Sequence, residues 1–485
     1  MLYDETNIDS ILDYSKGLIG KTFYEVIRDS DLAEDEKRQA IEKYGRETFK
    51  GGLGTLLEEV FFGYKANSKQ EADFSKVGIE LKSSPYEIKK DGSLRAGERL
   101  SITMVPHNRE IETDFYKSDV WHKIKLLLLI YYLRDEKSKS RLSFEIDYAY
   151  LLKIPQEDLD IIIDDYKKIA NKVISGKAHE ISESDTLYLG ACTKGANAKR
   201  STYFQFYGNH TPARARNFCL KQSYMSYVLN NYIRHNKVTY ESVMKSTSDY
   251  VKGLSFEENV VNSINKYKGK TDFELCQLFQ REYNNNKAQW ADLTYRMLGI
   301  KSNRAEEFAK ANIVVKAIRI EENGKIKENM SFPVFKYKEI INESWDSSKL
   351  RRYFEETKFL FVIFKKENSA YVLKGSHFWN MPILDLDGEV KKGWQEVVDT
   401  IRRGVHLEIT SKGVKNNLLK KTDNKIIHVR PHAQKSYHRF LDGTVVGNGK
   451  MSDANQLPDG RYMTNYCFWI NNDYIKEQIK KEYRD

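Results

Sequence analysis

The chain has 485 residues, of which 40% are hydrophobic and 31% are charged, with a formal net charge of +10. This length predicts two or three domains, and the composition excludes a disordered or fibrous chain. The longest apolar runs, Leu126–Leu133 and Phe359–Phe364, are too short to span a bilayer and are typical of buried strands. The basic excess favours a polyanionic partner, nucleic acid before membrane, although basic enzymes without such a partner are nearly as common.

The cysteines and the N-terminal residues indicate the compartment. Met1–Ser10 is acidic and lacks the apolar core of a signal peptide. No Cys-x-x-Cys pair occurs, so we expect neither a disulfide framework nor a zinc site, as in a reducing cytoplasm. The four scattered cysteines are Cys192, Cys219, Cys276 and Cys467.

The first predicted elements are helices. Gly17–Thr22 resembles a phosphate-binding loop, but Ser15 stands where that motif requires its first glycine. Thr22 and Glu25 instead predict a capping box that opens a helix. A charged helix is expected over Asp31–Tyr44.

A glycine-rich basic segment, Lys50–Gly54, leads into an amphipathic helix that ends near Gly63. Glu58 and Glu59 lie off its apolar stripe. One of them is expected either to face a neighbouring acidic site or to remain on the surface. The stripe consists of Leu53, Leu56, Leu57, Val60 and Phe61.

The segment Asp73–Lys82 carries the pattern from which we predict chemistry. Apolar residues alternate with Gly78, Glu80 and Lys82, which is typical of a half-buried strand. Glu80 and Lys82 therefore share one face. Asp73 precedes the strand, where a turn would bring it beside Glu80, and two carboxylates are sufficient to bind Mg²⁺. The commoner alternative for a Glu-x-Lys strand is a solvated face with a weak ion pair.

Further along, Pro85 is expected to end this strand, and an apolar strand is expected over Leu100–Val105. Residues 156–176 are predicted to form an acidic helix. A strand over Thr186–Ala191 leads into a basic loop of small residues at 193–200, which suits contact with phosphate or a base edge. The last unit of this half is a strand and helix over Phe218–Asn230.

The second half repeats the first in weaker form. Five segments match in the same order, so we predict two copies of one α/β domain with mixed sheets. The expected domains are residues 1–235 and 259–485, joined by a linker at 236–258. The matched segments begin at Gly20 and Gly269, Phe74 and Phe308, Leu126 and Leu360, Gly176 and Gly404, and Phe218 and Phe468.

The two copies differ at the predicted site. Asp73 aligns with Glu307 and Lys82 with Lys316, but Glu80 aligns with Val314. The second copy is therefore expected to fold alike without cleaving. It keeps a basic segment, in which Arg430 aligns with Thr193.

These residues resemble the MutH/Sau family of GATC-specific endonucleases. The family's form of the PD-(D/E)xK nuclease motif matches Lys50-Gly-Gly-x-Gly-x-x-x-Glu58 followed by Asp73-x6-Glu80-x-Lys82. Further family blocks match Val120-Trp-His-Lys-x-Lys125 and Thr193-Lys-x-Ala-Asn-Ala198. The length fits the two-domain Sau-type restriction enzymes rather than the single-domain mismatch-repair nickase.

The resemblance implies a role for individual residues. Asp73 and Glu80 would bind Mg²⁺, and Lys82 would be the catalytic lysine. Glu58 would support the metal site and Lys123 would be a further active-site lysine. The residues implied in DNA binding are Lys50, Gly51, Lys194 and Arg430. The family's Arg-Pro-Lys recognition loop reads Cys192-Thr193-Lys194 in the first copy, whereas Arg430-Pro431 of the second copy matches it better.

The resemblance also implies a function. It predicts a Type II restriction endonuclease of the bacterial cytoplasm that cleaves double-stranded DNA 5′ of G in GATC, with the second domain acting as an allosteric DNA-binding effector. A cognate DNA methyltransferase and a DNA-induced dimer or loop would accompany it. The alternatives are a mismatch-repair-type nickase and a non-cleaving DNA-binding regulator.

Overall fold

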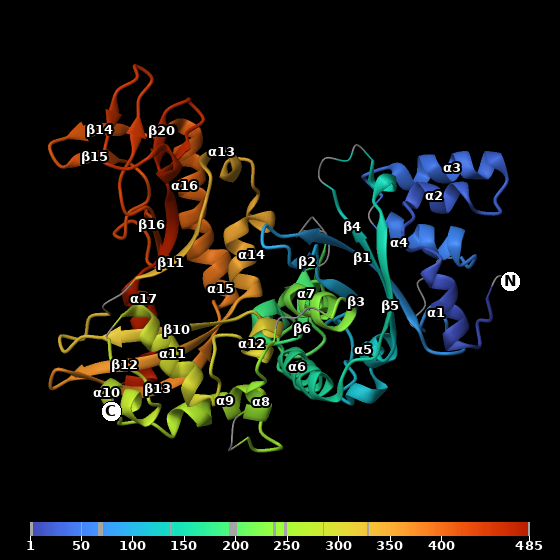
Figure 1. Ribbon diagram of the computed structural model, residues 1–485, viewed down its shortest axis with the longest axis horizontal. Helices are drawn as coiled ribbons and strands as arrows, with labels where there is room; N and C mark the ends of the chain where they lie inside the picture. The colour runs from blue at the N-terminus through green and yellow to red at the C-terminus, as the bar shows by residue number, and fades with distance from the viewer. Residues whose placement is uncertain are drawn as a thin grey trace. The chain divides into compact units, whose positions relative to one another are not determined.

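The computed structural model describes residues 3–49, 51–65, 71–135, 138, 140–193, 201–235, 239–246, 250–284, 286–326 and 329–483. The chain divides into two compact units. Unit 1 comprises Met1–Tyr240 together with Glu306–Asn312, and unit 2 comprises Glu241–Ala305 and Ile313–Asp485 (Figure 1). No helix of the described segments has the length and apolarity needed to cross a bilayer.

Two sheets form the framework of unit 1. The first has the order β2-β1-β4-β5, in which β1 and β4 are parallel and the other pairs are antiparallel. The second sheet, β3-β9-β6, is antiparallel throughout. The strands are β1 (Glu80–Ile88), β2 (Leu94–Ala96), β3 (Leu100–Met104), β4 (Leu127–Leu133), β5 (Ile146–Leu152), β6 (Leu189–Thr193), β7 (Thr202–Phe204), β8 (Pro212–Arg214) and β9 (Arg216–Leu220).

The N-terminal helices of unit 1 pack on one face of the first sheet (Figure 1). Leu53 and Leu56 meet Leu81 and Leu128 in one buried cluster. Thr22 and Glu25 form the predicted capping box. The helices are α1 (Ile8–Lys16), α2 (Phe23–Arg28), α3 (Glu34–Gly45), α4 (Gly52–Leu56), α5 (Asp119–Ile124), α6 (Gln156–Ile174) and α7 (Gln222–Tyr227), with π-helical turns η1 (Leu57–Phe61) and η7 (Val228–Ile233).

Pro85 does not end β1, contrary to the sequence-based expectation. The strand continues to Ile88, and Pro85 lies opposite Tyr132 of β4. The Glu80 N–H points toward β4, where it donates to the Leu126 carbonyl. Because N–H groups alternate in direction along a strand, the Pro85 nitrogen, an odd number of residues later, points to the opposite edge of β1. On that side β2 begins to pair only at Tyr86, so the missing N–H of proline leaves no ladder bond unmade.

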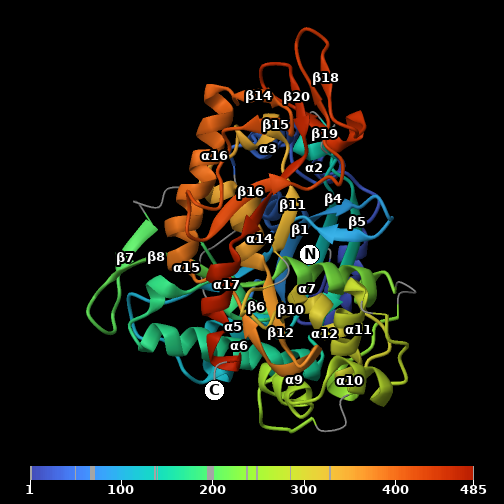
Figure 2. The same ribbon diagram turned by 90° about the vertical axis from the view of Figure 1, so that its left-hand side faces the viewer.

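Unit 2 repeats the plan of unit 1. The sheet β10-β12-β13 has a parallel pair followed by an antiparallel pair, as β1-β4-β5 does, and β11-β21-β16 matches β3-β9-β6 (Figure 2). The two-copy prediction is confirmed. The strands are β10 (Ile313–Ile320), β11 (Met330–Val334), β12 (Lys358–Glu367), β13 (Ala370–Trp379), β14 (Leu407–Thr410), β15 (Gly413–Asn416), β16 (Ile427–Pro431), β17 (His438–Arg439), β18 (Val445–Val446), β19 (Ala454–Gln456), β20 (Tyr462–Thr464) and β21 (Tyr466–Ile470).

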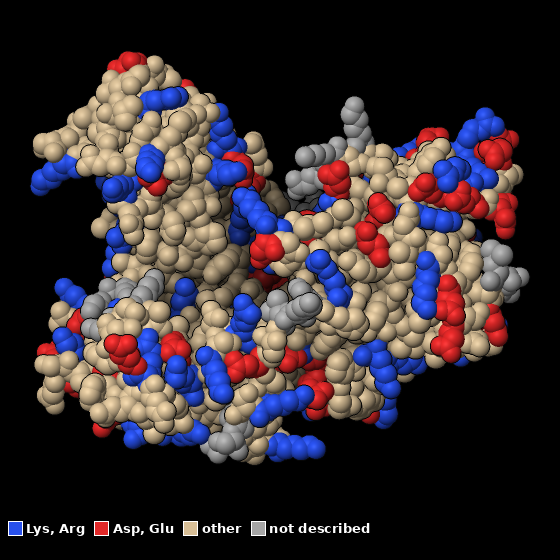
Figure 3. Space-filling model, in the orientation of Figure 1, with Lys and Arg blue, Asp and Glu red and all other residues tan. Residues whose placement is uncertain are grey.

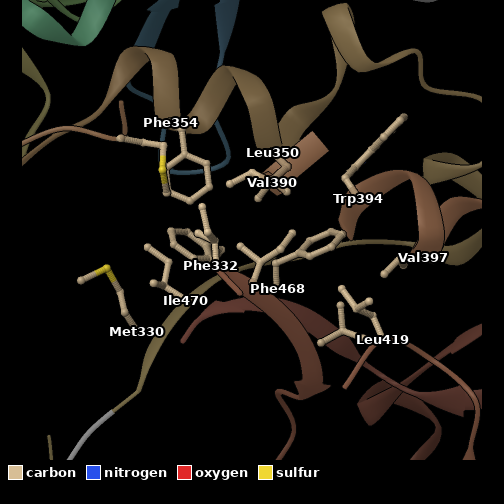
Figure 4. Packing of buried hydrophobic residues seen from close by; sticks show 14 of the residues in the cluster. Met330, Phe332, Leu350, Phe354, Val390, Trp394, Val397, Leu419, Phe468 and Ile470 are labelled. Atoms are coloured by element: carbon tan, nitrogen blue, oxygen red, sulfur yellow. The ribbon is translucent and has the colours of Figure 1, made fainter. Parts of the chain in front are cut away.

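The core of unit 2 is formed by its helices together with both sheets, β10-β12-β13 and β11-β21-β16. Phe332 and Phe468 point from the strands toward Phe354 of α14 and Trp394 of α16 (Figure 4). Thr271 and Glu274 repeat the capping box of unit 1. The helices are α8 (Val243–Ser246), α9 (Phe256–Asn265), α10 (Asp272–Leu278), α11 (Lys287–Met297), α13 (Tyr337–Ile340), α14 (Lys349–Glu356), α15 (Ile383–Asp385), α16 (Lys391–Arg403), α17 (Asn472–Gln478) and α18 (Lys480–Tyr483), with the π-helical turn η9 (Leu386–Val390).

One helix, α12 (Glu306–Ala311), belongs to unit 1 although it directly precedes β10. Lys310 is buried, and its ammonium lies 2.6 Å from Asp158 of α6 and 2.7 Å from Glu306. Ser223 of α7 donates a hydrogen bond to the Lys310 carbonyl. Glu307, which the sequence aligns with Asp73, is therefore part of unit 1 and does not accompany the strand of the second copy.

Candidate active site

The site forms around Glu80 at the start of β1. Glu80 is 1% exposed and lies on the same face as Lys82, as the alternation predicts. The Lys82 ammonium lies 2.7 Å from Glu80 Oε1. Lys123 of α5 reaches the same carboxylate, at 3.0 Å from Oε1 and 3.2 Å from Oε2. One buried carboxylate thus pairs with two ammonium groups. Because Glu80 is buried, this strand face is not the solvated surface with a weak ion pair that was the commoner alternative.

Asp73 is brought to this strand by a tight turn. Phe74 N–H donates to the Ile79 carbonyl, and Asp73 Oδ2 accepts a 2.8 Å hydrogen bond from Leu81 N–H. Gly78 adopts a φ of +72°, and a Cβ there would stand 2.7 Å from Cε of Lys125. The turn therefore favours glycine for its left-handed backbone, whereas the flexible end of the Lys125 side chain could move aside.

Glu58 is the carboxylate of the first amphipathic helix that faces the site. It lies in η1, where Phe62 N–H donates to the Leu57 carbonyl in a π-helical turn, a feature frequent at functional sites. Burial, reinforced by the negative charge of Asp73, raises the pKa of Glu58 to about 7. Glu59 instead pairs with Lys43 at 2.8 Å, on the outer side of the helix.

The residues at this site fit a divalent cation. Burial, and then the charge of Glu80, raises the pKa of Asp73, so the acidic groups repel one another in a partly desolvated place. A cation would relieve that repulsion. Within the described segments no group of three or more His, Cys, Asp or Glu side chains forms a metal cluster. Mg²⁺ requires fewer protein ligands than such a cluster provides, because it commonly binds through one or two carboxylates and keeps several waters.

Comparison with known proteins identifies the family. Residues 62–165, which contain Asp73, Glu80, Lys82 and Lys123, match the family model described as DNA mismatch repair enzyme MutH. The Type II restriction enzyme Sau3AI of Staphylococcus aureus is 32% identical over 478 residues, which cover 91% of this chain and 96% of that enzyme. The chain belongs to the MutH/Sau family of endonucleases.

Relatives of a second kind match only part of the chain. MutH proteins of Escherichia coli strains SMS-3-5 and K12 are each 28% identical over 181 residues, covering 37% of this chain and 76% of theirs. Because the Sau-type relative spans both units, the Sau-type assignment within the MutH/Sau family is confirmed. The chain is accordingly a Type II site-specific deoxyribonuclease, as the sequence predicts.

The MutH/Sau recognition segment can be compared between the units through the register of their sheets. Ala191 lies opposite Phe218 in unit 1, and Val429 lies opposite Phe468 in unit 2. Since Phe218 and Phe468 are the matched residues of the repeat, Arg430 corresponds to Cys192. The alignment of Arg430 with Thr193 was therefore displaced by one residue.

The structure describes two of the four residues for which the family resemblance implies a role in DNA binding. Arg430 is exposed, and its guanidinium lies 5.0 Å from the Trp469 ring centroid. Gly51 caps the start of α4 with a φ of +76°. Lys50 and Lys194 lie outside the described residues.

The charged surface of the chain includes regions where acidic and basic side chains are mixed. On α3 of unit 1, acidic and basic side chains alternate, with ion pairs such as Arg38 to Asp35 at 2.7 Å (Figure 3). Such a mixed face is typical of a solvated surface.

Proposed function

We propose that this endonuclease is a Type II restriction enzyme that recognises double-stranded GATC and hydrolyses the phosphodiester 5′ of G with Mg²⁺. The observation that carries the proposal is the buried Glu80 carboxylate, held by Lys82 and Lys123, beside Asp73. The similarity to a Type II restriction enzyme over nearly the whole chain supports the restriction role.

In this proposal Asp73 and Glu80 would hold Mg²⁺. The ion, when bound, supplies a Lewis acid that lowers the pKa of water and offsets charge on the phosphate. Lys82 stabilises the negative charge that develops on the phosphate oxygens during in-line attack. Lys123 orients the Glu80 carboxylate by donating to both of its oxygens. Glu58 would support the site from η1, where its carboxyl group lies close enough to Asp73 and Glu80 to interact with their charges.

We assign cleavage to residues 1–235 and DNA binding without cleavage to residues 259–485, with 236–258 as the linker. Val314 of β10 stands where Glu80 stands in the repeat, so unit 2 lacks the buried carboxylate that pairs with the lysines. Arg430 offers an exposed guanidinium suited to phosphate or guanine. Unit 2 would bind one GATC site and promote cleavage at another by looping or pairing the DNA.

Two partners follow from a restriction role. Double-stranded DNA that carries GATC is the substrate. A cognate methyltransferase would protect the host's own sites, and the enzyme would work in the bacterial cytoplasm.

The test is digestion of unmethylated plasmid with Mg²⁺, followed by sequencing of the ends. We expect breaks in both strands with each new 5′ end at the G of GATC. A product nicked in one strand would favour the mismatch-repair type of activity. Binding without any cleavage would favour a regulator, and ends at unrelated sequences would refute the GATC assignment.

A further inference from the structure

The aromatic cluster beneath the site contains three tyrosines, and their hydroxyls differ. Tyr3 donates to the Phe62 carbonyl and Tyr14 to the Phe61 carbonyl, both at 2.9 Å. The Tyr64 hydroxyl is buried and has no hydrogen-bond partner among the residues that the structure describes. Neither the sequence pattern nor the family motif draws attention to this residue.

The position of Tyr64 is fixed by the residues of the site. Its backbone N–H donates to the Glu58 carbonyl at 3.0 Å. Its ring packs edge-on against Phe74, the residue after Asp73, with centroids 5.5 Å apart. Burial, and after it the charge of Asp73, holds the pKa of the Tyr64 hydroxyl well above its ordinary value. The phenol therefore stays protonated and can act as a hydrogen-bond donor at neutral pH.

A buried donor without an acceptor destabilises the fold, so an unpaired hydroxyl beside a functional site calls for an explanation. Tyr64 and Asp73 line the same cavity, together with Phe74. The charge of Asp73 also contributes to the raised pKa of the Tyr64 hydroxyl. One oxygen of Asp73 accepts from Leu81 N–H, so its carboxylate has further acceptor capacity.

We infer that Tyr64 is a positioning residue of the cleavage site, whose hydroxyl donates a hydrogen bond to the Asp73 carboxylate when the divalent cation is bound. The bond orients Asp73 toward the cation while Leu81 N–H holds its other side. This inference rests on the proposed role of Asp73 and Glu80 as the metal-binding pair. It adds a supporting contact of the kind that tunes metal affinity in other sites.

The test compares Tyr64→Phe with Tyr14→Phe in the full chain. Both changes remove one hydroxyl and keep the ring, but only Tyr14 has a hydrogen-bond partner to lose among the described residues. Without divalent ions, we expect urea unfolding of Tyr64→Phe to occur at the same or a higher midpoint than that of the unchanged protein. Tyr14→Phe should unfold at a lower midpoint.

With Mg²⁺, single-turnover cleavage is measured across an ion titration, and DNA affinity is measured separately. Tyr64→Phe should raise the half-saturating Mg²⁺ concentration about tenfold with DNA affinity unchanged, and Tyr14→Phe should leave both unchanged. An unaltered Mg²⁺ requirement in Tyr64→Phe overturns the inference, whatever happens to its unfolding midpoint. Glu80→Ala, run in parallel, separates the two ideas: if it still cleaves, the proposed site itself is wrong.

Discussion

The buried ion pair between α12 and α6 gives the sharpest prediction about how unit 1 is held together. Lys310 and Asp158 have side chains that are 4% and 3% exposed, with 2.6 Å between ammonium and carboxylate. Tyr224 and Tyr232 donate to the other oxygen of Asp158 at 3.0 and 2.8 Å. Burial alone would lower the pKa of Lys310, but the charges of Asp158 and Glu306 outweigh it and raise that pKa.

Lys310→Met removes the charge and keeps the length of the side chain. Asp158 would then remain as a buried anion held only by two phenols, and breaking a buried pair in this way costs about 3–5 kcal/mol. Adding Asp158→Asn removes the unpaired negative charge while keeping an oxygen that accepts hydrogen bonds from Tyr224 and Tyr232. We expect the double variant to recover more than half of the loss, because contacting residues are strongly non-additive.

Hydrogen exchange of the α6 amides measures this loss in the right unit, because fluorescence would be dominated by unit 2. Unit 1 contains only Trp121 of the six tryptophans. Lys16→Met is the control, since Lys16 of unit 1 pairs with Asp13 at 2.7 Å on the exposed face of α1 and its loss should cost under about 1 kcal/mol. A loss below about 1 kcal/mol for Lys310→Met would refute the reasoning.

The remaining predictions concern the site and unit 2. Glu58 has a folded pKa of about 7 against 4.5 for a free side chain, so its burial should make the ion-free protein lose stability as pH rises from about 4.5 to about 7; Glu58→Gln should remove that contribution and leave a shallower slope in urea titrations at several pH values. Gly78→Ala should lower the unfolding free energy by about 1–2 kcal/mol, as should Gly63→Ala, because both positions have a left-handed φ and the only atoms close to a Cβ at Gly78 belong to the flexible end of Lys125; no loss at Gly78 would show that the turn does not hold its left-handed backbone. Arg430→Ala should weaken binding of a second GATC site and flatten the salt dependence of binding by about one phosphate contact, whereas an unchanged slope would remove Arg430 from the interface.

Strand periodicity was enough to predict the centre of the site. Glu80 and Lys82 share a face because side chains alternate along β1, and this follows from local sequence alone. Lys123 lies 43 residues from Glu80, and only the family resemblance pointed to it. The position of Asp73 depends on a turn whose glycine is visible in the sequence but whose hydrogen bond to Leu81 is not.

The errors of the sequence analysis arose where pairing partners decide the outcome. Pro85 ends a strand only if both of its edges are bonded, and the extent of β2 could not be known in advance. The repeat suggested that Glu307 takes the place of Asp73 in the second copy. In the structure α12 instead joins unit 1 through Lys310 and Asp158, a long-range contact that local patterns do not encode.

This contact also bears on where the chain can be divided. A fragment ending at residue 235 would lack α12 and leave Asp158 without its ammonium partner. A fragment beginning at 259 would carry α12 without the surface that it covers. We therefore expect the full chain to be the better material for binding and cleavage assays.

The most direct test of the central claim is to measure cleavage and DNA binding of Glu80→Ala side by side. Removing this carboxylate takes away one proposed ligand of the cation and the partner of both Lys82 and Lys123. We predict that cleavage of GATC plasmid in Mg²⁺ is abolished while the variant still binds GATC DNA. A variant that cuts at a rate near that of the unchanged enzyme would contradict the account.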